Sequence, residues 1–201
     1  MAISYPLSFP SHTGVRSIEI RARNAVAISR SPFTYDQQVH AYSGQCWEAD
    51  VSLPPMKASD AEQWIAFLMS LRGQYGTFTM GDTLNTSLRG TASAVTVTAA
   101  AGDSSLDVNV PNGETLKAGD WIQLGTGSSA TLHKVLQDYT GTGSLETDSL
   151  EVWPAVRVAH SGASATTSNT VGVWRLNVNE TVWNINEASV YGLTFGCIEA
   201  I

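Results

Sequence analysis

Residues 58–80 read ASDAEQWIAFLMSLRGQYGTFTM and predict a helix, a glycine turn and a strand. Apolar side chains recur there at the i, i+3, i+4 and i+7 spacing of one helix face; they are Ala61, Trp64, Ile65, Leu68 and Leu71. We find no other segment with a convincing helical pattern. A single amphipathic helix among strands must pack its apolar face on a sheet. We therefore expect the core to form around Trp64, Ile65 and Leu68.

Both ends of this helix carry sequence signals. Ser59, with Glu62 three residues later, matches a capping box, and Asp60 adds negative charge that the helix dipole favours in the first turn. Arg72 falls in the last turn, and Gly73 can adopt the left-handed backbone that ends many helices. These signals predict a helix over residues 59–72.

The composition narrows the class of protein. Only 14% of the 201 residues are charged, against roughly 25% in an average soluble domain, and 43% are hydrophobic. The net charge of −7 disfavours non-specific binding of nucleic acid. No apolar run approaches the roughly 20 residues that span a membrane, and the N-terminus does not resemble a signal peptide. We expect a protein that folds in a cytosol, without membrane insertion and without specific nucleic-acid binding.

Period-two alternation predicts strands in both terminal parts of the chain. It is clearest at residues 45–53, where Trp47, Ala49, Val51 and Leu53 share one face. Other strands are predicted at 15–22, 77–80, 173–177, 182–185 and 190–198. Asn24 is a turn candidate that would return the chain as a hairpin partner at residues 25–29. Residues 1–13 suggest a partly ordered arm, and residues 31–42 a loop that could carry one more short strand.

The amino-acid composition of the chain differs between about residues 86 and 171. Aromatic residues thin out, and small and β-branched residues alternate with glycine-containing turns. Short strands are predicted at 94–98, 105–110, 121–124, 131–136, 149–152 and 155–159. This spacing indicates a small, closed, OB-like β-barrel or a small sandwich. The chain is therefore predicted to be mainly β, with a discontinuous domain of residues 1–85 plus 172–201 and an inserted domain of residues 86–171.

Motifs for catalysis or metal binding are weak. The four histidines, His12, His40, His133 and His160, lack metal-ligand spacing. The carboxylate pairs Glu48/Asp50 and Asp60/Glu62 are explained by strand alternation and helix capping. Residues 103–109 do not match a calcium loop, and residues 73–78 follow a helix and so lack the order of a phosphate loop. We expect no catalytic residue, no cofactor and no metal.

The cysteines and tryptophans leave alternatives open. Cys46 and Cys197 fit two small buried residues better than a nucleophile, and a bridge requires that their strands lie side by side. A cluster of Trp121, Trp153, Trp174 and Trp183 could stack on sugars, although a structural core is the simpler interpretation.

The order of short motifs resembles that of distal tail proteins, which form the tail-tip ring of long, flexible-tailed bacteriophages and related prophages or gene-transfer particles. The resemblance spans most of the chain and rests on the following residues: Trp47, Leu53-Pro54-Pro55-Met56, Asp60-Ala61-Glu62, Phe67-Leu68, Leu71-Arg72-Gly73, Tyr75-Gly76-Thr77-Phe78, Gly81-Asp82, residues 116–124, Val152-Trp153-Pro154 and Tyr191-Gly192-Leu193-Thr194-Phe195.

This resemblance implies a non-enzymatic virion protein with a β-sandwich ring domain, a flanking helix and a second small β-domain. It implies a homo-oligomeric ring, hexameric or alternatively trimeric, that joins the tail tube protein to the tail-tip hub protein, with the tape-measure protein as a further candidate partner. The ring would assemble in the bacterial host cytoplasm and reside at the tail tip of the virion. Residues 1–13 and 32–42 are candidates for contact between its subunits. Two other functions are alternatives: a glycan-binding module that uses Trp121 or Trp153, and a cell-wall hydrolase.

Overall fold

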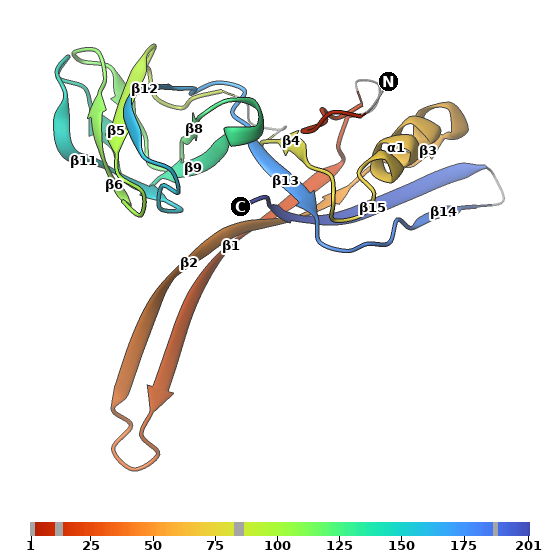
Figure 1. Ribbon diagram of the computed structural model, residues 1–201, viewed down its shortest axis with the longest axis horizontal. Coiled ribbons are helices and arrows are strands. Elements are labelled where there is room, and N and C mark those ends of the chain that lie inside the picture. Colours follow the sequence, from red (N-terminus) through yellow and green to blue (C-terminus); the bar gives the residue numbers. More distant parts are fainter. Residues whose placement is uncertain (1–2, 11–13, 83–86, 187–188) are drawn as a thin grey trace.

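The computed structural model describes residues 3–10, 14–82, 87–186 and 189–201. The protein is mainly β, with one α-helix in the described part of the chain, which confirms the predicted fold class. Three parts are visible in Figure 1: a sheet with the helix beside it, a compact β-barrel, and a two-stranded ribbon that projects away from both. No helix in the described residues is long and apolar enough to cross a membrane.

The largest sheet joins strands from both ends of the sequence. Its main path runs β1–β2–β15–β13–β4, and β3 and β14 pair with β15 in addition. The strands are β1 (Ser17–Arg30), β2 (Gln37–Ser52), β3 (Met56–Lys57), β4 (Phe78–Met80), β13 (Gly172–Leu176), β14 (Trp183–Ile185) and β15 (Val190–Glu199). We call this sheet with its helix the sheet unit. The predicted alternation of β2 is confirmed, because Trp47, Ala49, Val51 and Leu53 are all buried.

Helix α1 (Ala58–Ser70) packs its apolar face into the core of the sheet unit. The predicted apolar face is confirmed, and Phe67 joins it as a further buried residue. The predicted N-cap is wrong: the cap position is Lys57, and no side chain caps the helix by a hydrogen bond. Arg72 lies beyond the helix end in a left-handed conformation, as does Gly73, whose left-handed backbone was predicted.

The N-terminal residues do not form a free arm where the structure describes them. Leu7 pairs in parallel with Phe78, donating its N–H to the Thr77 carbonyl over 2.9 Å. Phe9 enters the aromatic core and stacks on Phe78 at a centroid distance of 5.6 Å. Residues 3–10 thus cover the outer edge of β4, which corrects the prediction. The predicted N-terminal segment, residues 1–13, also included residues 1–2 and 11–13, which lie outside the described residues.

The prediction for residues 15–42 is wrong in its turn and its loop. Strand β1 continues through Asn24 to Arg30, and its partner is β2 rather than residues 25–29. The turn lies at residues 31–36, because β2 already begins at Gln37. The register shifts between Asn24 and Val26, where two steps along β1 face four along β2. The result is one long hairpin whose outer half extends beyond the sheet (Figure 1).

The barrel, as we call residues 87–171, is built from six strands in the order β12–β5–β6–β11–β9–β8. These strands are β5 (Val95–Ala99), β6 (Ser105–Asn109), β8 (Trp121–Leu124), β9 (Thr131–Val135), β11 (Glu146–Trp153) and β12 (His160–Ala165). Gln123 and Thr166 exchange backbone hydrogen bonds of 2.8 and 2.9 Å, which brings the two ends of the sheet together. An OB-fold barrel has five strands, so this barrel has one more.

Smaller elements complete the barrel. They are β7 (Thr115–Leu116), β10 (Tyr139–Thr140) and a 3₁₀ turn, η1 (Gly127–Ser129). The strand predicted at residues 155–159 is wrong, since the sixth strand lies at His160–Ala165 instead. The barrel has its own buried hydrophobic cluster, separate from that of the sheet unit. The barrel is inserted in the chain between β4 and β13. These two strands are antiparallel neighbours, with Gly172 opposite Met80. The predicted limits of the two domains, residues 1–85 plus 172–201 and residues 86–171, stay a prediction.

Candidate assembly interface

The most distinctive surface of the molecule is the outer half of the β1–β2 hairpin, residues 22–44, which we call the arm. With the exception of half-buried Ser31, every residue of the arm is exposed. A two-stranded ribbon that lacks a third strand or a helix is marginally stable in water. The arm is therefore the part of this fold that gains most from contact with another molecule.

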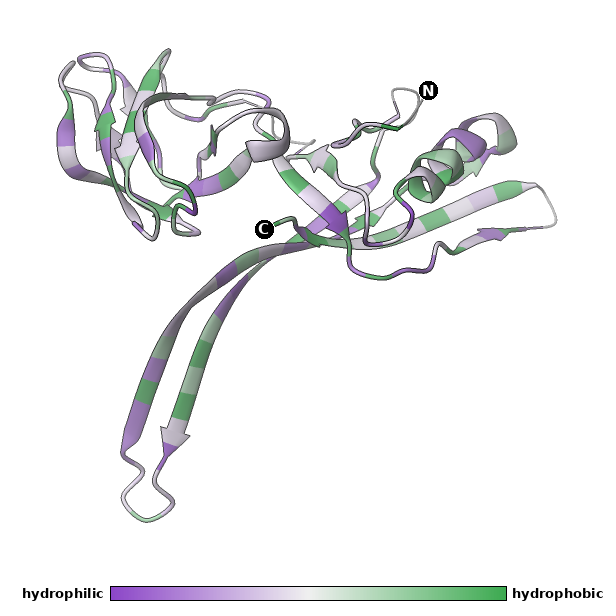
Figure 2. Cartoon of the chain, viewed as in Figure 1, coloured by the Kyte–Doolittle hydropathy of each residue, from purple (hydrophilic) through white to green (hydrophobic). Residues whose placement is uncertain are grey.

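One face of the arm is apolar. The pairs Val26/Ala41 and Ile28/Val39 lie directly opposite each other, so their side chains point to the same side of the ribbon. Ile28 is 64% exposed and Val39 is 57% exposed. Figure 2 shows hydrophobic bands that continue along both strands of the arm. Contiguous exposed apolar side chains of this kind mark interaction sites on soluble proteins.

This face continues the core face of the sheet. Along β2, the residues that point into the core are Trp47, Ala49 and Val51, and Val39 and Ala41 have the same odd parity. The register shift spans two residues along β1 and four along β2, both even numbers, so side chains keep the same face on each strand across it. In the sheet unit α1 and residues 3–10 cover this face, whereas nothing in the described chain covers it on the arm.

The arm also presents unpaired strand edges. Strand β1 pairs only with β2, and β2 meets β15 only from Glu48 onward. Within the described residues, both edges of the arm thus lack a neighbouring strand. Exposed edges offer rows of backbone donors and acceptors to a strand from another chain.

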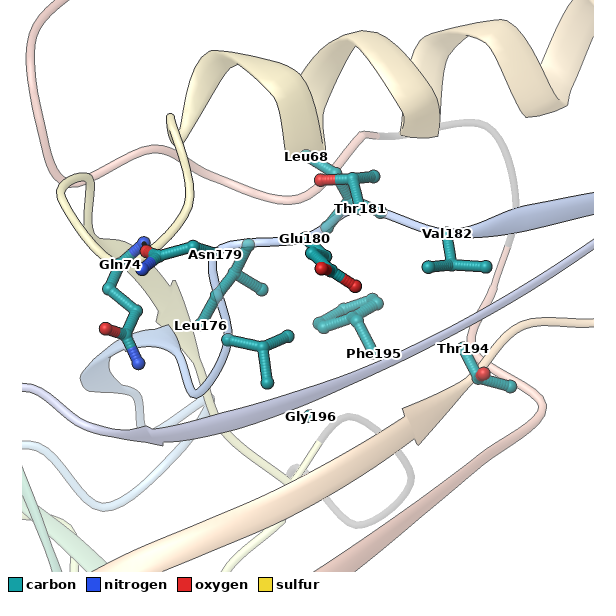
Figure 3. A pocket seen from close by; sticks show the side chains of 11 residues that line it. Leu68, Gln74, Leu176, Asn179, Glu180, Thr181, Val182, Thr194, Phe195 and Gly196 are labelled. Atoms are coloured by element: carbon teal, nitrogen blue, oxygen red, sulfur yellow. Dashed lines mark hydrogen bonds between the residues drawn. The ribbon is translucent and has the colours of Figure 1, made fainter.

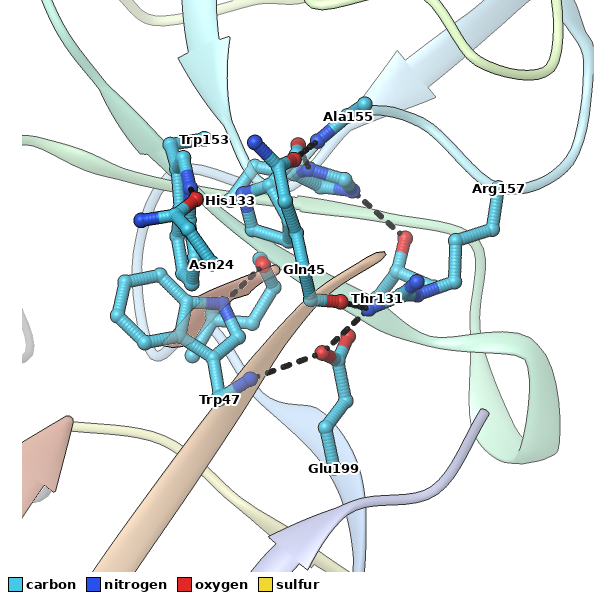
Figure 4. A network of polar contacts seen from close by, with 11 residues as sticks. Asn24, Gln45, Trp47, Thr131, His133, Trp153, Ala155, Arg157 and Glu199 are labelled. Carbon is cyan, nitrogen blue, oxygen red and sulfur yellow. Dashed lines mark hydrogen bonds and ion pairs between the residues drawn. The ribbon is translucent and has the colours of Figure 1, made fainter. Parts of the chain in front are cut away.

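The root of the arm is held by the barrel (Figure 4). Asn24 accepts a hydrogen bond of 2.8 Å from Trp153 Nε1, and Gln45 Oε1 accepts one of 2.8 Å from the Ala155 N–H. Arg157 donates to the Gln45 carbonyl over 2.7 Å and pairs with Glu199 at 2.7 Å. These contacts fix the base of the arm relative to the barrel.

Trp47 is the apolar centre of the same junction. Its ring lies 5.0 Å from that of Trp121 and 4.3 Å from that of Trp153, and its Nε1 donates to the Leu132 carbonyl over 2.9 Å. Two of the four tryptophans considered for sugar stacking, Trp121 and Trp153, therefore pack against Trp47 and are only partly exposed. Of the other two, Trp174 is buried and Trp183 lies on β14. The four do not form one exposed platform.

The residues considered for chemistry are dispersed. His133 is buried between the Pro154 carbonyl at 2.8 Å and the Thr131 hydroxyl at 2.9 Å, and burial lowers its pKa to about 4. The neutral ring, with Nδ1 donating to the carbonyl, fits both contacts. His40 lies on the arm and His160 on the barrel, while His12 lies outside the described residues. No group of His, Cys, Asp or Glu within the described ranges could hold a metal ion.

The acidic pair Glu48 and Asp50 serves the hairpin rather than a cleft. Glu48 forms an ion pair with Arg23 at 2.6 Å, and Asp50 pairs with Arg21. Cys46 and Cys197 are both free thiols. Burial raises the pKa of Cys46, and it raises the pKa of Cys197 to about 12, so neither thiol is activated as a nucleophile.

A groove lies on the α1 side of the sheet unit, between the end of α1, the segment after β13, and β15 (Figure 3). Its volume is about 440 Å³, and its apolar lining includes Leu68, Leu176 and Phe195. Val178, Glu180 and Val182 line the same groove and are exposed. Among the described residues that line it, Glu180 is the one acidic or basic side chain, so these residues form no titratable cluster suited to catalysis.

Residues 32–42 were predicted from the sequence as candidate contacts, but the apolar face of the arm was not. The alternation of Val26 with Ile28, and of Val39 with Ala41, is present in the sequence and could have extended both predicted strands. No protein-family model and no curated protein matches the chain.

Proposed function

We propose that this chain is a structural virion protein that forms a homo-oligomeric ring at the distal end of a long, flexible bacteriophage tail. The ring joins the tail tube protein to the tail-tip hub protein, and the tape-measure protein is a further candidate partner. Six copies are expected, with three as the alternative. The proposed place of assembly is the bacterial host cytoplasm, and the proposed final location is the tail tip.

The observation that carries this proposal is the arm. It exposes an apolar face and two strand edges, which are features suited to contact with another chain rather than to catalysis. Identical subunits that use two different surfaces for one contact form a closed ring when the rotation closes. The order of sequence motifs supplies the location at a phage tail tip, and the low content of charged residues agrees with a protein that buries much of its surface in partners.

Shortening the arm tests the proposal without disturbing the junction. Asn24 pairs with Gln45 in register, so residues 25–44 can be replaced by Asn-Gly, which forms a tight two-residue hairpin turn. Asn24 and Gln45, which hold the root of the arm against the barrel, are both retained. Light scattering behind size exclusion should show a ring for the natural chain and a monomer for the shortened chain. A cooperative urea transition should show that the shortened chain stays folded.

A suitable control removes an exposed apolar side chain far from the arm. Leu145 is exposed on the barrel, and Leu145→Ser should leave the oligomer mass unchanged. A natural chain that stays monomeric at every concentration would refute the proposal, and a shortened chain that still forms the full ring would show that the arm does not carry it. The glycan-binding alternative has no specific support, since Trp121 and Trp153 pack against Trp47. The hydrolase alternative has none either, since Glu180 is the one acidic or basic side chain among the described residues that line the groove.

A further inference from the structure

The tip of the arm is a preformed apolar projection. Ser31 accepts the Tyr35 N–H with its carbonyl over 3.1 Å and donates its own N–H to the Asp36 carbonyl over 2.9 Å. Arg30 lies over the Tyr35 ring, 4.6 Å from its centroid. Phe33 is 93% exposed at the end of this ordered turn. An aromatic side chain held out by an ordered turn loses little conformational freedom on binding, which favours affinity.

The groove described above offers a matching surface. Its exposed apolar surface comes from Val178 and Val182, which are 50% and 68% exposed, and from partly buried Phe195. Leu68 and Leu176 also line the groove but are almost fully buried. Its volume of about 440 Å³ falls within the roughly 300–1,000 Å³ of typical binding pockets. Figure 3 shows Glu180 beside Phe195 in the groove. Within the described residues Glu180 forms no ion pair.

The charges of the two surfaces are complementary. The arm carries two arginines and one acidic residue, Asp36, in a chain whose net charge is −7. Arg23 is already paired with Glu48, so the complementary charge is that of Arg30. Arg30 is near the tip and forms no ion pair with another described residue. An arm tip that enters the groove can therefore bring Arg30 toward Glu180 while Phe33 covers the apolar atoms. Paired charges at an interface fix its orientation and exclude wrong partners.

The tip cannot reach the groove of its own molecule. The arm projects to the lower left, away from the sheet unit, whereas the segment between β13 and β14 that lines the groove runs beside β15 to the right of the root of the arm (Figure 1). We propose that the groove binds the arm tip of a second copy of this chain, with Phe33 as the apolar anchor and Arg30 next to Glu180. This inference rests on the proposed ring. Tip and groove are different surfaces of one subunit, as a head-to-tail contact that repeats around a ring requires.

Sedimentation velocity on the full chain over a range of concentrations tests this docking. Phe33→Ser and Glu180→Arg should each raise the concentration of half-assembly by at least about tenfold, the size of loss expected when an anchoring group is removed. Arg30→Glu should do the same. The double variant Arg30→Glu with Glu180→Arg should recover most of the loss, because the charges are exchanged. Arg30, Phe33 and Glu180 are all exposed, so thermal unfolding of the variants should match that of the natural chain at a concentration at which all of them are monomeric.

The outcomes separate this inference from the proposed ring. If the shortened arm abolishes assembly but Phe33→Ser and Glu180→Arg assemble as the natural chain does, the arm docks elsewhere and the inference is overturned while the ring stands. Single variants that weaken assembly without rescue by the charge exchange also overturn it. If the groove variants form normal rings but lose binding to purified tube or hub protein, the occupant of the groove is that protein. A monomeric natural chain overturns both proposals.

Discussion

Trp47→Ala should destabilise the protein strongly, because Trp47 contacts both units. The side chain is 6% exposed and lies against Trp121 and Trp153. Truncation of a buried tryptophan to alanine costs about 3–5 kcal/mol. The two ring contacts account for about 0.5–1.5 kcal/mol each, and the hydrogen bond from Nε1 to the Leu132 carbonyl for about 1 kcal/mol. We therefore expect a loss near 4 kcal/mol, and a loss of about 1–2 kcal/mol for Trp47→Phe, which keeps an aromatic ring.

Urea unfolding followed by far-ultraviolet circular dichroism measures this loss without relying on tryptophan fluorescence. All variants should be compared at one protein concentration, since assembly adds to apparent stability. Trp183→Ala is the matched control, because Trp183 is partly exposed on β14, away from the junction (Figure 1). It should change stability by less than about 1 kcal/mol. If Trp47→Ala also changes it by less than that, the junction does not hold the two units together and the reasoning fails.

Three further predictions concern buried groups. Trp64→Ala should lower the free energy of unfolding by about 3–5 kcal/mol in the same urea assay and should abolish the ring, because Trp64 is 1% exposed in the aromatic core; a stable, ring-forming variant would contradict this. Burial raises the pKa of Cys46 and raises the pKa of Cys197 to about 12, so at about pH 8 a thiol reagent should label native Cys46 slowly and Cys197 only after unfolding. Burial lowers the pKa of His133 from 6.5 to about 4, so only the unfolded chain binds this proton between those values. The free energy of unfolding should then fall, by on the order of 3 kcal/mol, as the pH drops from about 6.5 to about 4, and His133→Gln should flatten that part of the profile.

The parts of the fold that follow a strict apolar period were predictable from the sequence. The stripe on α1 and the alternation of Trp47, Ala49 and Val51 both face one buried core, so residue type and position agree. The predicted capping box at Ser59 is wrong because the chain passes directly from β3 into α1, which places Lys57 at the cap position. Helix ends depend on such tertiary entry paths more than helix centres do.

The segments that were mispredicted take their structure from distant partners. Phe9 joins the core only because β4 accepts Leu7 as a neighbour, a contact between residues far apart in the chain. The strand His160–Ala165 consists of small and polar residues, and its pairing with β5 rather than its own pattern defines it. β-propensity is known to depend on such context.

The candidate interface was predictable only in outline. Residues 32–42 were expected to contact a neighbour, but Asn24 suggested a turn where the structure has a register shift. The arm has no core of its own, so its residues carry only a short apolar alternation. Sequence reasoning also could not bring Leu68, Glu180 and Phe195 together in one groove, since they come from three separate elements.

Electron microscopy of the purified full chain tests the central claim most directly, because it shows whether copies of the protein meet through their arms. We predict closed rings, with six copies expected and three as the alternative, in which each arm lies against the next subunit. Isolated monomers with free arms at every concentration, or closed rings in which the arms point away from all neighbours, would contradict the account.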